Sequence, residues 1–361
     1  MGRIYNFNAG PSTLPLSVLE RARDEFVEYA GKGMSIIEMS HRSPEYDAVH
    51  RGAMDLVREL LGLPDNYKVL FIGGGATLQF AMAPMNFLPR GASCDFTVTG
   101  SWAKKAYADA QKIGKANVVF DGKDDNYLNL PQPADLKLDP DAAYLHMTSN
   151  ETIGGIQWHE FPDAGKVPIV CDMSSDFMSR RLPLDKFGLI YAGAQKNAGP
   201  AGVAVVIIRD DMVERCPDDL PAYLSYKIHH AKDSLYNTPP VFAIYMVNRV
   251  MQWVKDQGGL EAVEKLADER AGLVYGAIEK DSGFYRCPVP AHCRSKMNVV
   301  FRLPSEELEK QFIAEAGEQG LGGLKGHRSV GGCRASIYNA MPVEGAKALA
   351  DFMGEFAKKN G

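Results

Sequence analysis

Short apolar runs alternate with longer amphipathic stretches through the first two thirds of the 361-residue chain. Seven of these runs have the length and apolar content of buried strands. They cover residues 68–72, 94–98, 117–120, 143–147, 168–171, 189–192 and 203–208. Amphipathic stretches at 76–87 and 101–113 predict helices between them, and two further helices are predicted between 16 and 61, behind Pro15 and Ser43-Pro44. This alternation predicts an α/β fold with a mostly parallel sheet that helices cover on both faces.

The last third of the chain has a different pattern. Helices are predicted over 240–255 and from Gly258-Gly259 to about residue 280, and then strand 297–303, helix 305–319, strand 333–338 and helix 343–359 follow. We therefore expect a large domain, 1–258, and a smaller α+β domain, 259–361, against which the N-terminal segment 1–15 can pack. Ligands of open α/β sheets bind at the carboxyl ends of the strands, so the residues after each apolar run are the candidates for chemistry.

Composition narrows the class of protein further. Hydrophobic residues make up 45% of the chain and charged residues 24%, which is typical of a folded protein with a core. A net charge of −5 does not suit a polyphosphate partner. The longest aliphatic run is far below the roughly 18 residues of a membrane span, the first ten residues are too polar for a secretory leader, and the six cysteines form no C-x-x-C pair. We expect a cytoplasmic protein without nucleic-acid or membrane partners.

A run of glycines at 73–75 joins a predicted strand to a predicted helix. Glycine allows close approach of the backbone, and the free N–H groups at a helix start bind anions such as phosphate. The spacing matches neither G-x-G-x-x-G nor the P-loop, so a tight turn without a ligand is an equally good interpretation.

Two charged residues follow other apolar runs. Asp172 ends a buried strand, where it either caps the next element or holds a cationic ring nitrogen by a charge-assisted hydrogen bond. Lys196 lies among small residues between two strands. Most lysines are solvated surface charges, but a desolvated lysine has a lowered pKa and forms Schiff bases with carbonyl compounds. A phosphate cradle, an acid for a ring nitrogen and a reactive lysine together indicate a pyridoxal phosphate site.

Six segments resemble the phosphoserine aminotransferase family, which belongs to the class V aminotransferases of the fold-type I pyridoxal phosphate enzymes. They are NFNAGPSTLP at 6–15, MSHRSPEY at 39–46, CDMSSDFMSR at 171–180, AGAQKNAGPAG at 192–202, KDSLYNTPP at 232–240 and GHRSVGGCRASIYNAMP at 326–342. The resemblance implies reversible transamination between 3-phosphohydroxypyruvate plus L-glutamate and O-phospho-L-serine plus 2-oxoglutarate, in serine biosynthesis. It also implies a second phosphorylated substrate, 3-hydroxy-2-oxo-4-phosphobutanoate, of pyridoxal phosphate biosynthesis.

The resemblance implies a role for each matching residue around the cofactor. Lys196 would form the Schiff base and move the α-proton, Asp172 would keep the pyridine nitrogen protonated, and Trp102 would stack on the ring. Without the resemblance, Trp102 is an ordinary aromatic residue at a helix start. The other cofactor contacts would come from Gly75, Ala76, Thr77, Thr152, Ser174 and Gln195, and from Asn237 and Thr238 of the neighbouring subunit of a homodimer. Some relatives have Arg or Ser in place of Thr77, which leaves the role of this side chain open.

The expected substrates are anionic at both ends, so the site needs two cationic clamps. Arg334 resembles the family's ligand for the α-carboxylate. His327 and Arg328, with His41 and Arg42 of the partner subunit, resemble the distal site for phosphate or γ-carboxylate. An isolated arginine is usually a surface salt bridge, but here arginine follows histidine in two separate motifs.

Other interpretations stay open from the sequence. An alanine–glyoxylate transaminase would not require the paired His-Arg motifs, and a cysteine desulfurase would require a mobile nucleophilic cysteine that no loop motif supplies. A nucleotide-binding or structural dimer would use 73–75 for phosphate without a reactive lysine. We expect no metal site, because His229-His230 is interpreted as a solvated turn and the group Cys287, His292 and Cys293 lacks a fourth ligand.

Overall fold

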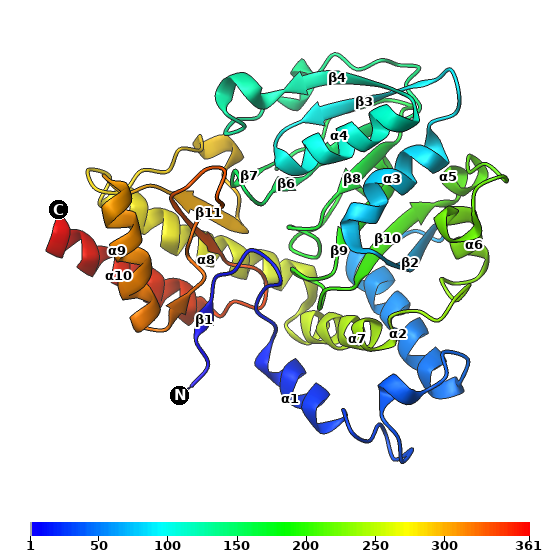
Figure 1. The fold of residues 1–361 in the computed structure, drawn as a ribbon, viewed down its shortest axis with the longest axis horizontal. Coiled ribbons are helices and arrows are strands. Elements are labelled where there is room, and N and C mark those ends of the chain that lie inside the picture. Colours follow the sequence, from blue (N-terminus) through cyan, green and yellow to red (C-terminus); the bar gives the residue numbers. More distant parts are fainter. Residues whose placement is uncertain (1) are drawn as a thin grey trace.

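The computed structural model describes residues 2–361 and is built around a seven-stranded sheet in the order β2-β10-β9-β8-β5-β3-β4 (Figure 1). The strands are β2 Tyr67–Gly73, β3 Ser93–Val98, β4 Lys115–Asp121, β5 Leu145–Thr148, β8 Ile169–Asp172, β9 Phe187–Gly193 and β10 Val203–Arg209. All seven predicted runs belong to this sheet, and every observed boundary lies within two residues of the predicted one. The strand β10 is antiparallel to β2 and β9, and the other pairs are parallel. The predicted mostly parallel α/β fold is confirmed.

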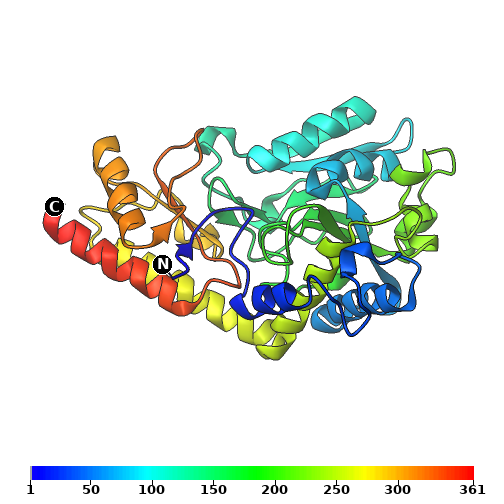
Figure 2. The same ribbon diagram turned by 60° about the horizontal axis from the view of Figure 1, so that its bottom comes forward.

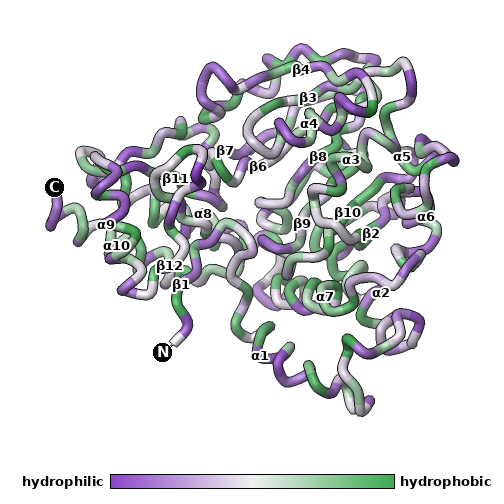
Figure 3. The backbone as a smooth tube through the Cα atoms, in the orientation of Figure 1, coloured by the Kyte–Doolittle hydropathy of each residue, from purple (hydrophilic) through white to green (hydrophobic). Residues whose placement is uncertain are grey.

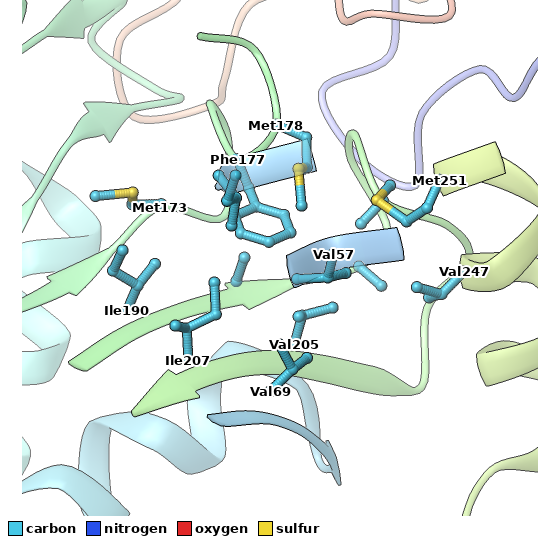
Figure 4. Close-up of a cluster of buried hydrophobic side chains, with 14 of the residues drawn as sticks. Val57, Val69, Met173, Phe177, Met178, Ile190, Val205, Ile207, Val247 and Met251 are labelled. Carbon is cyan, nitrogen blue, oxygen red and sulfur yellow. The ribbon is translucent and has the colours of Figure 1, made fainter. Parts of the chain in front are cut away.

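Alternate residues of the central strands point to opposite faces of the sheet and enter two separate cores. Val205 and Ile207 of β10 pack with Val57 of α2 (Pro44–Leu61) and Val247 of α7 (Val241–Asp256), and these side chains lie together in Figure 4. Val206 packs on the other face, with residues of α3 (Gly75–Phe87) and α4 (Ser101–Ile113). Strands buried on both faces are apolar almost throughout, and the green central strands of Figure 3 show this.

The helix ends follow local signals in the sequence. Ser43 caps α2 by accepting a hydrogen bond from the backbone N–H of Tyr46 at 3.3 Å, and Pro44 occupies the first helical position. Gly62 ends α2 in the left-handed conformation, with φ 64°. The helix α1 (Leu16–Asp24) begins directly after Pro15, as predicted.

The C-terminal part forms a second core beside the sheet. Its elements are α8 Gly259–Lys280, β11 Asn298–Phe301, α9 Glu306–Glu318, β12 Leu321–Gly322, β13 Cys333–Ser336 and α10 Val343–Asn360. Figure 2 shows α8 and α10 side by side along this part. The N-terminal strand β1 (Tyr5–Asn6) pairs with β12, although neither strand was predicted.

The helix α8 contributes to both cores. Val263 near its start packs in the core around α2 and α7, whereas Val274 and Ile278 pack in the C-terminal core. The boundary that we propose between a large domain, 1–258, and a small domain, 259–361, therefore lies at the start of a helix whose first turns still pack in the core of the large domain.

The remaining elements are short. They are β6 Asn150–Glu151, β7 Ile156–Gln157, α5 Asp210–Glu214, α6 Tyr226–Ala231, and 3-10 turns at Ile36–Glu38, Gly122–Asp125, Pro133–Asp135, Leu184–Lys186, Ala222–Leu224 and Ala291–Cys293. The prediction of a solvated turn at His229-His230 was wrong for His229. This residue is buried on α6, and its Nε2 lies 2.8 Å from the carbonyl oxygen of Tyr223.

Among residues 2–361, no three His, Cys, Asp or Glu side chains are grouped to hold a metal ion. The helices of this range are all too short or too polar to cross a membrane.

Candidate active site

Five strands of the sheet end at one edge and bring the candidate segments together there. The segments after β2, β3, β5, β8 and β9 line a single cavity of about 470 Å³, which His327 and Arg334 of the C-terminal part complete. The predicted site residues in its wall are Gly75, Ala76, Thr77, Trp102, Thr152, Asp172, Ser174, Gln195, Lys196, His327 and Arg334. This is the carboxyl edge at which parallel α/β sheets bind ligands.

Lys196 is the central side chain of the cavity and is only 8% exposed. Its Nζ donates a hydrogen bond to Thr152 Oγ1 at 2.6 Å and lies 5.8 Å from the centre of the Trp102 ring. Ser12 Oγ donates to the carbonyl oxygen of Lys196 at 2.6 Å. A Cβ atom on Gly10 would lie 3.4 Å from Cγ of Lys196. The N-terminal segment therefore packs directly over the lysine stem.

Burial lowers the pKa of Lys196 to about 8, because removal from water disfavours the charged amine. The nearby Asp172 and Glu151 carboxylates oppose this shift, and the positive charge of Arg334 adds to it. A lysine in this range carries a reactive neutral fraction near neutral pH, which an exposed lysine does not.

Asp172 ends β8 and is 4% exposed. Burial raises the pKa of this carboxyl group, while hydrogen bonds from Ser174 and the charge of Lys196 act in the opposite direction. Its Oδ1 accepts a hydrogen bond from the backbone N–H of Ser174 at 2.8 Å. A cation beside this carboxylate would stabilise the ionised form.

The glycine run after β2 forms an open helix start. Gly74 and Gly75 have φ values of 89° and 61°, which residues with a Cβ rarely adopt. No side chain caps α3, so the N–H groups of its first turn have no acceptor from a capping residue. Ser174 faces the same cavity, and its Oγ accepts a hydrogen bond from the N–H of Gly193 at 3.0 Å. The arrangement suits a phosphate group.

Arg334 on β13 approaches the cavity from the C-terminal part. Its Nη1 donates to the carbonyl oxygen of Thr152 at 3.3 Å, and its Nε is buried without a hydrogen-bond partner. His327 lies in the loop before β13, and the adjacent Arg328 is exposed and outside the cavity wall. The structure thus brings Arg334 and His327 to the site, but not Arg328.

Four other predicted site residues lie outside the cavity of their own chain. His41 and Arg42 precede α2, and Asn237 and Thr238 follow α6, and none of them lines the cavity wall. All four were predicted to act in the site of a partner subunit.

Several polar residues of the cavity were not predicted. Thr148 and Asn150 follow the apolar run of β5, and Ser175 follows that of β8, so their position after a strand was the available signal. Glu151 was also missed. Its buried carboxylate contacts the start of α4 behind the cavity.

The cavity fits a flat cofactor that carries a carbonyl group, a ring nitrogen and a phosphate. Trp102 Nε1, Thr148 Oγ1 and Arg334 Nε are buried polar atoms of cavity residues that have no hydrogen-bond partner within the protein. Buried polar groups normally have a partner, so these atoms indicate a polar ligand. The lysine, the acid and the open helix start supply the remaining contacts that pyridoxal phosphate requires.

Comparison with known proteins agrees with this chemistry. The family model described as aminotransferase class-V matches residues 4–349. The chain is 54% identical to the phosphoserine aminotransferase of Niallia circulans over 99% of both sequences.

Two solved structures have the same fold. The phosphoserine aminotransferase from Bacillus circulans subsp. alkalophilus has a TM-score of 0.98 at 54% identity and 99% coverage of both chains. The pyridoxal-phosphate-bound phosphoserine aminotransferase from Trichomonas vaginalis has a TM-score of 0.92 at 40% identity, with 97% of this chain and 99% of that chain covered. The chain therefore belongs to the class V aminotransferases and, within them, to the phosphoserine aminotransferase family.

Proposed function

We propose that this enzyme interconverts 3-phosphohydroxypyruvate plus L-glutamate with O-phospho-L-serine plus 2-oxoglutarate, the transamination of serine biosynthesis, with pyridoxal phosphate as cofactor. One observation carries the proposal: Lys196, Asp172 and the uncapped start of α3 converge on a single cavity in a chain of this family. The same convergence disfavours a nucleotide-binding or structural dimer, which would not need a buried lysine.

Bound pyridoxal phosphate supplies an aldehyde that condenses with primary amines and a ring that stabilises the electron pair left when an α-proton departs. We assign Lys196 Nζ to covalent attachment and to carrying that proton, for which a pKa of about 8 is well matched. Asp172 holds the ring nitrogen in its protonated form, Trp102 covers one face of the ring, and Thr152 Oγ1 binds the ring hydroxyl and orients Nζ.

The phosphate end of the cofactor is assigned to the start of α3. The backbone N–H groups of Ala76 and Thr77 donate to it, and the positive φ of Gly75 keeps the approach open. The side chains of Ser174 and Gln195, which line the same cavity, complete the cradle.

The substrate's two anionic ends are assigned to two cationic groups. Arg334 binds the α-carboxylate, because its unpartnered Nε and its contact with Thr152 give it a donor beside Lys196. His327, which lines the cavity, is assigned to the distal phosphate or γ-carboxylate, together with the adjacent Arg328, which lies outside the cavity wall. Substrates with an uncharged side chain would leave this distal pair without a partner, which disfavours an alanine–glyoxylate transaminase.

We also propose a homodimer in which each subunit lends His41, Arg42, Asn237 and Thr238 to its partner's site. Exposed apolar side chains support a contact surface just before His41. They are Phe26, Val27, Met34 and Ile37, with Val27 79% exposed.

The segment that carries Asn237 and Thr238 is anchored at its base. Asp233 and Ser234 both have positive φ values, 50° and 63°. Lys68 Nζ forms an ion pair with Asp233 Oδ1 at 2.6 Å, and Ser234 Oγ accepts from the N–H of Phe71 at 2.9 Å. These contacts support a preformed segment that presents its exposed tip to a partner.

A cytoplasmic location completes the proposal. All six cysteines are free thiols and five of them are buried, which suits a reducing compartment.

Replacing Lys196 with alanine tests the function directly. The purified enzyme should be yellow and transaminate phosphoserine with 2-oxoglutarate. Lys196→Ala should lose the visible absorbance band of the attached cofactor and lower kcat by roughly 10²- to 10⁴-fold, the usual contribution of a positioned proton carrier. Lys227→Ala, at an exposed ion pair with Asp218, is the matched control and should behave as wild type. Retention of both band and turnover, or a borohydride-fixed adduct mapped to another residue, would refute the assignment.

The lowered pKa of Lys196 predicts a pH dependence in the cofactor-free protein. Only the neutral amine reacts with an arylating reagent, so modification of Lys196 should rise about tenfold per pH unit below 8 and level off above it. Exposed lysines, with pKa values near 10.4, should keep rising through this range. Peptide mapping of the modified protein measures each site separately. A plateau for Lys196 only above pH 10 would contradict the desolvated environment.

Arg334→Ala should raise KM for both L-glutamate and phosphoserine, since each presents an α-carboxylate. Loss of a charge-assisted hydrogen bond worth about 1.5–3 kcal/mol corresponds to a rise in KM of roughly 10- to 150-fold. Initial-rate kinetics with each donor provide the measurement, and Arg215→Ala at a surface ion pair serves as control. An unchanged KM for either donor would count against the clamp.

Mixed dimers test the shared sites. A Lys196→Ala subunit paired with an Arg42→Ala subunit contains one site with both mutations and one site with neither. Refolding the two inactive chains together at equal amounts should restore about one quarter of the wild-type activity, because half of the dimers are mixed and each has one intact site. Activity that stays at the level of the separate variants would show that Arg42 acts within its own subunit or not at all.

A further inference from the structure

Glu151 is a buried acid that the transamination assigned above does not use. It is the last residue of β6, is 1% exposed, and directly precedes Thr152. Thr152 Oγ1 is the group that accepts the hydrogen bond from Lys196 Nζ. The chain therefore places this carboxylate one residue from a side chain in direct contact with the reactive amine.

The helix α4 depends on Glu151 for its first hydrogen bonds. It has no side-chain cap of its own and no acidic residue in its first turn. Glu151 Oε1 accepts from the backbone N–H of Ala103 at 3.0 Å, and Oε2 accepts from the N–H of Trp102 at 3.3 Å. A residue from another element thus satisfies two N–H groups at the positive end of this helix.

Gly100 makes this approach possible. A Cβ atom at position 100 would lie 2.5 Å from the carboxyl carbon of Glu151, closer than any real contact. The backbone before α4 is therefore pressed against the Glu151 side chain, and a larger residue would push Trp102 away from it. Steric contact and hydrogen bonding act on the same short segment.

The electrostatic environment agrees with a role in holding the helix. Burial raises the pKa of Glu151 to about 7, and the N–H groups of Ala103 and Trp102 oppose that rise. The charge of Asp172 adds to the rise and that of Lys196 opposes it. A buried carboxylate is tolerated only where strong hydrogen bonds replace water, and here the helix start provides them.

We propose that Glu151 is a positioning residue for the active site: by capping α4 from outside the helix, it fixes the Trp102 indole beside Lys196 and holds α4 against β6, which Thr152 directly follows. The inference rests on the proposed function, in which Trp102 covers the cofactor ring. Glu151 acts through Trp102 and Thr152 and needs no contact with cofactor or substrate.

The test compares Glu151→Ala, Glu151→Gln, Trp102→Ala and the double variant Glu151→Ala/Trp102→Ala as holoenzymes. Ser305→Ala is the matched control, because Ser305 caps α9 in the C-terminal part by accepting from the N–H of Leu308. Four quantities are measured: amide exchange at positions 102 and 103, visible circular dichroism of the bound cofactor, its dissociation constant, and kcat against KM.

Glu151→Ala should accelerate exchange of both amides, weaken the cofactor dichroism and raise the cofactor dissociation constant about tenfold, in line with the loss of a helix cap. We expect kcat to fall while KM for glutamate changes little. Glu151→Gln keeps one acceptor oxygen, so its effects should be smaller than those of Glu151→Ala. If the alanine variant does not fold, the same measurements on Glu151→Gln test the inference. In the Trp102→Ala background, the further change Glu151→Ala should raise the cofactor dissociation constant less than twofold, because the effects of coupled residues are not additive.

Four outcomes would overturn the inference. In one outcome, Glu151→Ala accelerates amide exchange but leaves the cofactor dichroism and the cofactor dissociation constant unchanged, as Ser305→Ala does. Glu151 would then be an ordinary helix cap. Full additivity in the double variant would show that Glu151 does not act through Trp102. If Trp102→Ala itself leaves cofactor binding unchanged, the role of Trp102 in the proposed function fails, and the inference fails with it. Loss of cofactor binding in Trp102→Ala but not in Glu151→Ala would refute the inference alone.

Discussion

An amine that has to react near neutral pH must be taken out of water, and the architecture around Lys196 meets this requirement. The flanking strands β9 and β10 are buried on both faces, so the loop between them starts and ends inside the protein. Gly10 and Ser12 of the N-terminal segment then cover the lysine from outside. Complete burial of an unpaired cation would be too costly, and the carboxylates of Asp172 and Glu151 limit how far the pKa falls. Burial thus lowers the pKa of Lys196, and the neighbouring carboxylates keep the free-energy cost of burying its charged form small.

The same edge of the sheet also joins the two parts of the chain. Asn298 of β11 accepts a hydrogen bond from Asn150 Nδ2 at 2.8 Å, and its own Nδ2 donates to Ser336 Oγ at 3.0 Å. Asn339 N donates to Asn197 Oδ1 at 2.9 Å, immediately beside Lys196 in sequence. Ser336 lies two residues after Arg334 on β13. This buried polar network therefore governs how far Arg334 lies from Lys196.

Predictions from the sequence succeeded where the residues adjacent in the chain indicate a residue's environment. Central parallel strands are buried on both faces, so they are continuous apolar runs. Ser43-Pro44 indicates a helix start because serine caps helices and proline is favoured at the first helical position. The strands β1 and β12 were missed because two residues form no periodic pattern, and each exists only through its pairing with the other. His229 was misjudged for a related reason: α6 packs it inward, which its sequence neighbours do not indicate.

The sequence by itself determined the fold class and the candidate glycines, acid and lysine, because apolar runs, a glycine turn, an acid after a strand and a lysine among small residues are local features. The resemblance of six motifs indicated the family. Only the tertiary structure decided that Thr152 contacts Lys196, that Arg334 donates to the carbonyl oxygen of Thr152, and that Glu151 caps a helix some fifty residues earlier in the chain. Hydrogen-bond partners and desolvation depend on which distant segments meet at the carboxyl edge of the sheet. No pattern within a single segment contains that information.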